Sequence, residues 1–155
     1  MPVSSPAGLA LQRVDFYVLE SSDSRERLKV ACQEVERAFL AEERVLVWFD
    51  DAQELALFDD LLWTFADRSF VPHEPISTES SWDESPVLLS AGLQPAPPAV
   101  LCNLAKEVPP GVSGTQRVIE IIDADPVRRQ AGRARFKQYR DLGIEPTTHK
   151  LAVAK

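Results

Sequence analysis

A run of five apolar residues, Val45 to Phe49 (VLVWF), constrains the fold of this chain more than any other feature of the sequence. Interior strands of a parallel sheet are apolar throughout, because helices cover both of their faces. Amphipathic helical patterns flank this run, over residues 25–40 and 51–67. A helix is also the usual crossover between parallel strands. The sequence therefore predicts an α/β fold in which this run lies at the centre of a mainly parallel sheet.

Four further short runs are apolar, with β-branched and aromatic residues, and we expect them to be strands of the same sheet. They cover residues 14–19, 87–90, 99–104 and 117–122. Residues 67–86 carry Pro, Ser and acidic residues without sustained periodicity, which predicts a long surface loop. We therefore predict one Rossmann-like domain over residues 13–155, with helices flanking its sheet, after a flexible N-terminal leader over residues 1–12.

The last predicted helix has clear boundaries and an unusual charge pattern. Asp125 suits the N-cap, Pro126 the first helical position and Gly143 the C-terminal cap, which places the helix at residues 126–142. Residues 127–140 hold six of the 17 basic residues of the chain and no acidic residue. At 100° per residue, one helical face combines cations with an aromatic ring. That face consists of Arg129, Arg133, Phe136, Lys137 and Arg140.

This cationic face suits an acidic peptide. Guanidinium groups hold carboxylates through paired hydrogen bonds, and an apolar side chain of the peptide can pack beside them. Two other interpretations stay open. The face could simply be solvated, with its late cations near the C-terminal end of the helix dipole. It could also bind nucleic acid, although a net charge of −7 and a pI of about 4.9 predict weak, salt-sensitive binding.

The sequence holds no recognisable nucleotide site. The turn after the first strand, Glu20 to Asp23, is acidic and has no glycine. The glycines within residues 111–114 lack the Gly-Lys-Ser/Thr ending of a phosphate-binding loop. His73 and His149 do not stand beside a nucleophile motif, so we predict no cofactor and no catalytic residue. An enzyme derived from a nucleotide-binding fold stays an alternative, because unrelated functions share such scaffolds.

Acidic pairs and cysteines give little sign of a metal site. Asp50-Asp51 and Asp59-Asp60 offer oxygen ligands, but solvated helix faces explain them more simply. Cys32 and Cys102 lack the spacing of a zinc site and are predicted to be buried free thiols in a reducing compartment. Because no apolar run approaches the roughly 20 residues that cross a bilayer, and because the N-terminus lacks the features of a secretory signal, we predict a cytoplasmic protein.

Five short segments, in order from about Arg13 to Gly143, together resemble the chi subunit family of bacterial DNA polymerase III. They are Phe16-Tyr17, Arg44-Val45-Leu46, Leu62-Trp63, Ser69-Phe70-Val71-Pro72-His73 and Arg135-Phe136-Lys137-Gln138-Tyr139-Arg140. The last two segments, at this separation, are the most specific. The resemblance implies a nucleotide-binding-like α/β fold without the nucleotide site, and a non-catalytic accessory subunit of the clamp loader.

The resemblance also implies two binding surfaces. Members of this family bind the acidic C-terminal tail of single-stranded-DNA-binding protein, which ends in a phenylalanine carrying the terminal carboxylate. The resemblance implies that the tail-binding residues of this chain are those at the matching positions, namely Ile122, Arg129, Arg133, Phe136 and Lys137. The second surface binds the psi subunit of the clamp loader or a helicase, and Trp63 and Phe70 match its hydrophobic anchors. Core positions are the alternative for both aromatic residues. Any contact with DNA is then indirect.

Overall fold

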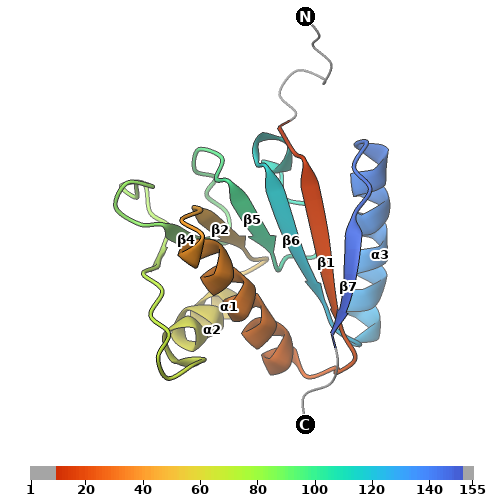
Figure 1. Ribbon diagram of the computed structural model, residues 1–155, viewed down its shortest axis with the longest axis horizontal. Helices are drawn as coiled ribbons and strands as arrows, with labels where there is room; N and C mark the ends of the chain where they lie inside the picture. The colour runs from red at the N-terminus through yellow and green to blue at the C-terminus, as the bar shows by residue number, and fades with distance from the viewer. Residues whose placement is uncertain (1–9, 152–155) are drawn as a thin grey trace, which may run out of the picture.

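The computed structural model describes residues 10–151, and in this range three α-helices flank a seven-stranded sheet (Figure 1). The strand order is β3-β4-β2-β5-β6-β1-β7, and all the strand pairs are parallel. The strands are β1 (Arg13–Leu19), β2 (Val45–Trp48), β3 (Glu74–Pro75), β4 (Val87–Ser90), β5 (Val100–Asn103), β6 (Arg117–Ile122) and β7 (Thr147–Leu151). The helices are α1 (Ser24–Leu40), α2 (Ala52–Thr64), α3 (Pro126–Asp141) and a short 3-10 turn, η1 (Val112–Gly114). The predicted α/β fold with a parallel sheet is confirmed.

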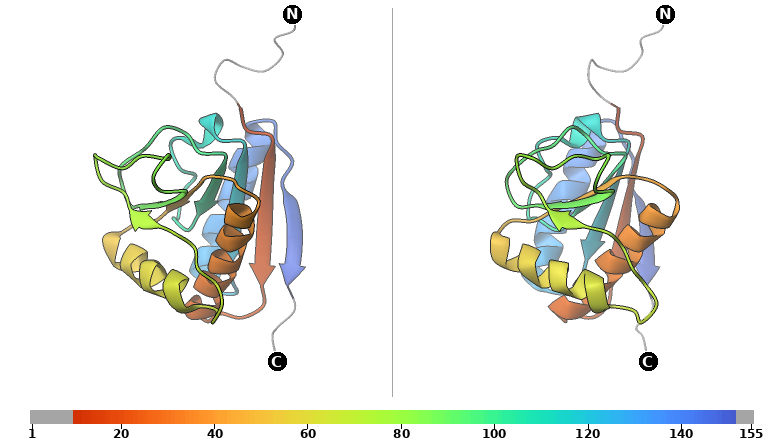
Figure 2. Two further views of the ribbon diagram at one scale, coloured as in Figure 1. Left: turned by 60° about the vertical axis from the view of Figure 1, so that its left-hand side comes forward. Right: turned by 90° about the vertical axis from the view of Figure 1, so that its left-hand side faces the viewer.

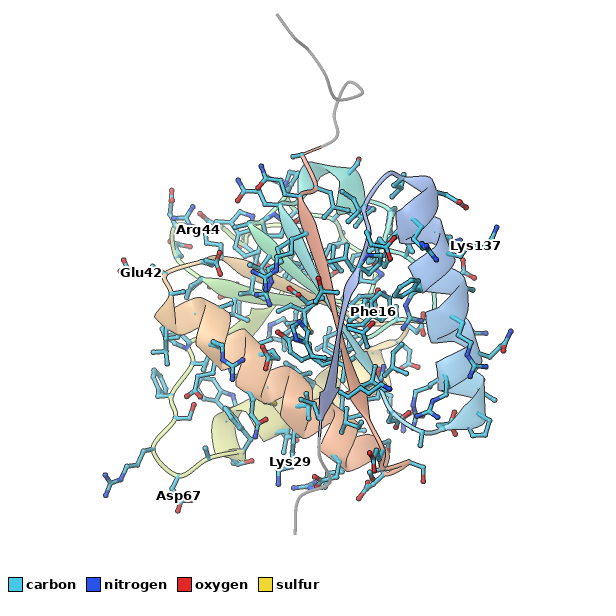
Figure 3. The ribbon with its side chains drawn as sticks, turned by 45° about the vertical axis from the view of Figure 1, so that its right-hand side comes forward. Phe16, Lys29, Glu42, Arg44, Asp67 and Lys137 are labelled. Atoms are coloured by element: carbon cyan, nitrogen blue, oxygen red, sulfur yellow. The ribbon has the colours of Figure 1, made fainter. Side chains whose placement is uncertain are left out.

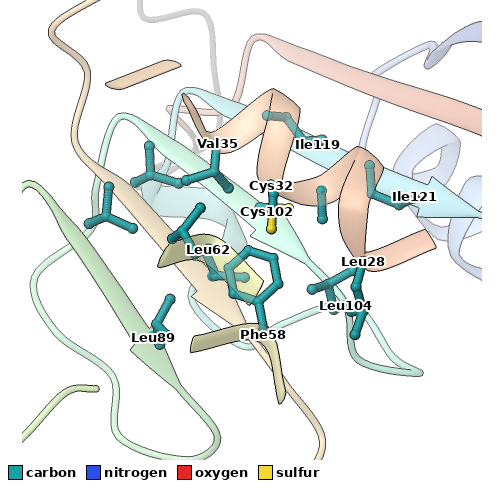
Figure 4. Close-up of a cluster of buried hydrophobic side chains, with 14 of the residues drawn as sticks. Leu28, Cys32, Val35, Phe58, Leu62, Leu89, Cys102, Leu104, Ile119 and Ile121 are labelled. Carbon is teal, nitrogen blue, oxygen red and sulfur yellow. The ribbon is translucent and has the colours of Figure 1, made fainter. Parts of the chain in front are cut away.

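Helices α1 and α2 cover one face of the sheet, and α3 covers part of the other (Figures 1 and 2). The larger core lies under α1 and α2, where Phe58, Leu62 and Cys32 meet alternate strand residues (Figure 4). Alternation within β2 follows the pleat, because Val45 and Val47 join this core while Leu46 faces the opposite side. Cys32 and Cys102 are free and buried here, as predicted, and burial raises the pKa of Cys32 to about 12.

The face opposite α1 and α2 is covered in two parts. Helix α3 packs on β6 and β1, where Tyr139 and Phe16 are almost fully buried. Beyond α3, the strand residues Leu46, Leu88 and Leu101 are covered by side chains that include Trp82. Trp82 also donates a hydrogen bond from Nε1 to the carbonyl oxygen of Ala96 at 2.9 Å. The segment over residues 67–86, predicted to be a surface loop, therefore packs in part against the sheet and contributes strand β3.

An aspartate at the N-cap precedes each of these α-helices, and its carboxylate accepts a backbone N–H. Asp23 accepts from Arg25 at 2.9 Å, Asp51 from Glu54 at 2.8 Å, and Asp125 from Arg128 at 2.9 Å. Beyond the end of α3, Gly143 has a φ of 94°, which glycine adopts without strain. Helix α2 ends at Thr64, a little earlier than predicted.

Strand β7 is the main element that the sequence did not predict. Its residues, TTHKL, are mostly polar and exposed, as expected for an edge strand paired on one side only, with β1. At the other end of the chain, Leu11 is buried and the Gln12 N–H donates to Gln116 at 2.8 Å, so residues 10–12 of the predicted leader pack against the domain. Residues 1–9 and 152–155 lie outside the described residues. Within the described range, no helix has the length and apolarity that a membrane span requires.

Candidate functional site

A buried polar network fixes α3 to the sheet. Glu120 of β6 is fully buried and forms an ion pair with Arg135 of α3 at 2.9 Å. It also accepts hydrogen bonds from the Tyr139 hydroxyl at 2.6 Å and from the Asn103 amide at 2.9 Å. Burial raises the pKa of Glu120, although Arg135 and these hydrogen bonds oppose the shift. Because the network holds one side of α3 on β6, the opposite side is fixed toward β7 and solvent.

The network and two further ion pairs neutralise half of the cations of α3. Arg135 binds Glu120, Arg128 binds Asp123 at 2.6 Å, and Arg140 binds Glu145 at 3.0 Å. For the other three cations, Arg129, Arg133 and Lys137, the structure shows no ion pair with any residue in the range 10–151. Within the same range, the Arg129 guanidinium makes one hydrogen bond, a long one of 3.5 Å to the Leu19 carbonyl. The positive charge that remains available therefore lies along one edge of α3.

A groove of about 420 Å³ lies between α3 and β7 and contains most of the predicted tail-binding residues. This volume is within the usual range for ligand sites. Its lining is Phe16, Val18, Glu20, Ile122, Arg129, Gly132, Arg133, Phe136, Thr148 and Lys150. Figure 3 shows Phe16 between β7 and α3. The ring of Phe136 packs on Phe16 with centroids 5.2 Å apart, so the groove has an apolar floor beside two guanidinium groups.

Four of the five residues predicted for this site come together in the groove: Ile122, Arg129, Arg133 and Phe136. The fifth, Lys137, is exposed on α3 outside the groove lining (Figure 3). Sequence reasoning missed the residues from β1 and β7 and the glycine of α3. The alternation of Phe16 and Val18 along β1, continued by Glu20 just after the strand, could have indicated one of these walls. The residues of β7 could be assigned only with its strand pairing.

The groove wall formed by β7 is attached to β1 through a buried carboxylate. Asp15 of β1 is fully buried. Its carboxylate accepts hydrogen bonds from Arg117 at 2.8 Å and from His149 of β7 at 2.9 Å. The His149 ring also stacks on Tyr17, with centroids 4.7 Å apart. Burial acts to raise the pKa of Asp15, but hydrogen bonds from His149 and Arg117 outweigh it and leave that pKa lowered. His149 is thus a structural contact that holds the edge strand in register.

Trp63 and Phe70 form an exposed aromatic patch on the opposite side of the molecule from the groove. Trp63, near the end of α2, is 43% exposed, and Phe70 is 67% exposed, so neither is a core residue. Their ring centroids are 5.4 Å apart, and the His73 ring lies 4.1 Å from Trp63. His73 donates from Nδ1 to the Val71 carbonyl at 2.7 Å, and its Nε2 lies 2.8 Å from the Asp59 carboxylate. His73 therefore fixes the patch between α2 and the following segment.

A second cavity, of about 220 Å³, lies beyond the ends of β2 and β5. This is the edge where doubly wound sheets bind nucleotides. Several of its charged groups have partners within the protein: Arg27 binds Glu54 at 3.2 Å, and the Asp50 carboxylate accepts a hydrogen bond from the backbone N–H of Lys106 at 2.8 Å. Over residues 10–151, no group of three or more His, Cys, Asp or Glu side chains could hold a metal ion.

The sequence model of the family described as "DNA polymerase III chi subunit, HolC" matches residues 11–147. The match therefore includes the aromatic patch and all of the groove lining except Thr148 and Lys150. This chain belongs to the DNA polymerase III chi subunit family. The chi resemblance carried by five short sequence segments is confirmed, and the chain is a member of a family of replication proteins.

Two chi proteins are similar to the chain over nearly its whole length. DNA polymerase III subunit chi of Pseudomonas aeruginosa is 35% identical over 142 residues, which cover 91% of this chain and 98% of that protein. The chi subunit of Haemophilus influenzae is 24% identical over 140 residues, or 88% of this chain and 95% of that protein.

The fold of this chi family member also resembles a domain from a different protein. The C-terminal domain of the DEAD-box protein Dbp5 matches with a TM-score of 0.57 over 91% of each chain, at 11% identity. At this identity the similarity shows the fold alone, and it agrees with the nucleotide-binding-like architecture predicted from the sequence.

Proposed function

We propose that the chain is a non-catalytic replication adaptor that binds the acidic C-terminal tail of single-stranded-DNA-binding protein in the groove between α3 and β7. One observation supports this proposal above all. Arg129 and Arg133 line the same groove as the apolar side chains of Ile122 and Phe136. The proposal also rests on membership of the chi family.

The chemistry of the groove fits both parts of such a tail. The terminal phenyl ring packs on Ile122 and Phe136, and burial of a side chain of this size contributes about 1.5–3 kcal/mol. The terminal carboxylate and the acidic side chains bind the guanidinium groups of α3, which form paired hydrogen bonds with carboxylates. A phenylalanine at this aromatic position has no hydroxyl group, so it contributes packing and no hydrogen bond to the tail.

Direct binding of DNA is the weaker explanation for the same cations. Arg128, Arg135 and Arg140 are each paired with a carboxylate of the protein. The remaining cations of α3 belong to a chain with a formal net charge of −7. Few phosphate contacts on an acidic protein give weak, salt-sensitive affinity. The adaptor therefore reaches single-stranded DNA through its protein partner.

The aromatic patch of Trp63 and Phe70 supplies the second surface of the adaptor. Exposed aromatic side chains bury a large area at low entropic cost, which suits an interface anchor. We propose that this patch joins the chain to the clamp loader, through a psi subunit where one exists, or to a helicase. Because α2 and α3 lie on opposite faces of the sheet, both surfaces can be occupied at once (Figure 1).

Calorimetric titration with a synthetic copy of the tail tests the proposal. The peptide should copy the C-terminus of the same organism's single-stranded-DNA-binding protein, and the control peptide should lack the final phenylalanine. We expect binding near 1 μM, or about −8.2 kcal/mol, for the first peptide and strong loss for the second. The absence of heat from both peptides, with the protein shown to be folded, would refute tail binding.

A further inference from the structure

We propose that Lys150 of β7 is a further tail-binding residue, which holds a carboxylate of the peptide from the wall opposite Arg129 and Arg133. This inference rests on the proposed function and adds a second cationic wall to the same groove. Lys150 lies outside the cationic face of α3 and comes from the strand that the sequence did not predict.

Strand geometry directs Lys150 toward the groove. Lys150 pairs with Val18 of β1, and Thr148 pairs with Phe16, and all four side chains line the groove. Side chains alternate between the two faces of a strand, so His149, between Thr148 and Lys150, points to the opposite face. There it binds Asp15 at 2.9 Å and stacks on Tyr17.

The Asp15–His149 contact therefore determines which face Lys150 occupies. A slip of β7 by one residue would move Lys150 to the other side of the sheet and break the contact with the buried carboxylate. Because Asp15 is fully buried, the loss of its histidine partner is unfavourable, and the observed register is maintained. The contact of His149 on one face of β7 thus holds the strand in a register that places Lys150 on the other face, in the groove.

The charge of Lys150 is available to a ligand. Lys150 is exposed, and within residues 10–151 the structure shows no ion pair for it. Arg129 and Arg133 approach the groove from α3, so a carboxylate between the walls is attracted from both sides. Glu20 is the acidic residue of the groove lining, and it repels carboxylates from the end of β1. The three cations of the two walls outnumber this carboxylate, so the groove as a whole attracts the acidic tail.

Titration of the acidic tail peptide into the full-length variants Lys150→Ala, Lys150→Glu and Lys29→Ala tests this inference. Lys29 is the matched control, because it is a partly exposed lysine on α1, on the opposite face of the sheet (Figure 3). For Lys150→Ala we expect about three- to tenfold weaker binding, between the effect of an exposed ion pair and that of a charge-assisted hydrogen bond. Lys150→Glu should weaken binding further, and Lys29→Ala should leave it unchanged.

The outcomes separate this inference from the function on which it rests. If wild-type protein and Lys29→Ala bind the peptide but Lys150→Ala binds equally well, the role of Lys150 is refuted while tail binding stands. If the wild-type protein does not bind, both proposals fall. A smaller salt dependence of the affinity in Lys150→Ala than in the wild type supports a direct charge contact, because fewer ionic contacts are then lost at high salt.

Discussion

Gly132 of α3 lies so close to Ile122 of β6 that a β-carbon at position 132 would overlap the Cδ1 atom of the isoleucine. Both residues line the groove, and this close approach sets the distance between α3 and the floor of the groove. Glycine therefore permits this close packing without any shift of Ile122 or α3, even though it costs about 1 kcal/mol in a helix relative to alanine.

Replacement Gly132→Ala should weaken tail binding more than it changes stability. The added methyl group displaces either the Ile122 side chain or α3, which changes the apolar floor of the groove. Overpacking of this kind costs about 1–3 kcal/mol, and the better helix propensity of alanine returns about 1 kcal/mol. Calorimetry with the tail peptide and urea unfolding measure the two effects. In an Ile122→Val background, which lacks Cδ1, Gly132→Ala should have a smaller effect, and equal effects in both backgrounds would contradict this explanation.

Arg133→Ala should weaken tail binding about ten- to a hundredfold, because a charge-assisted hydrogen bond contributes roughly 1.5–3 kcal/mol. Lys137→Ala should have a smaller effect, since Lys137 is exposed outside the groove lining. Peptide titration at two salt concentrations measures both. Lys29→Ala, which removes a partly exposed cation of α1 on the opposite face of the sheet, is the control. A larger loss for Lys137→Ala than for Arg133→Ala would place the tail on the outer side of α3.

Arg135→Ala should destabilise the protein by about 3–5 kcal/mol at neutral pH, because it leaves the carboxylate of Glu120 buried without its cation. Arg140→Ala should cost less than about 1 kcal/mol, since that pair is exposed. Urea unfolding compares the two variants. Similar losses in both would show that the buried network contributes little to stability.

The loss of unfolding free energy in Arg135→Ala should depend on pH in a defined direction. Burial raises the pKa of Glu120 above its ordinary value of 4.5, and removal of Arg135 raises it further. The folded state then binds a proton more tightly than the unfolded state, so stability falls as pH rises from about 4.5 through the folded pKa. The difference in unfolding free energy between variant and wild type should therefore shrink as pH is lowered toward about 5. A constant difference from about pH 8 to pH 5 would contradict the assignment to Glu120.

Phe70→Asp should abolish association with the clamp loader or helicase partner while leaving tail binding intact. The side chain is 67% exposed, so the change should alter unfolding free energy by less than about 0.5 kcal/mol. Co-purification of the partner and titration of the tail peptide measure the two activities separately. Leu93→Asp changes another exposed apolar residue, which is 48% exposed, and serves as the control. Retained association in Phe70→Asp would move the second surface elsewhere.

Local sequence determined most of the helices and strands. The predicted strand boundaries at 87–90 and 117–122 agree with β4 and β6. Asp125, Pro126 and Gly143 placed α3 within one residue of its observed end, because caps act on neighbouring backbone groups. The apolar run at Val45 indicated a strand buried on both faces, and β2 lies inside the sheet between β4 and β5. The concentration of cations in α3 was also visible in the sequence.

Only the tertiary structure decided which of these cations remain available and what they face. Arg135 is neutralised by Glu120, a partner on strand β6, and sequence periodicity carries no information on such pairs. The short polar strand β7 forms because the edge of β1 and the buried Asp15 accept it, so its position depends on contacts distant in the chain. The helix pattern alone predicted a cationic face, whereas the packing of α3 against β6 and β1, next to β7, made that face one wall of a groove.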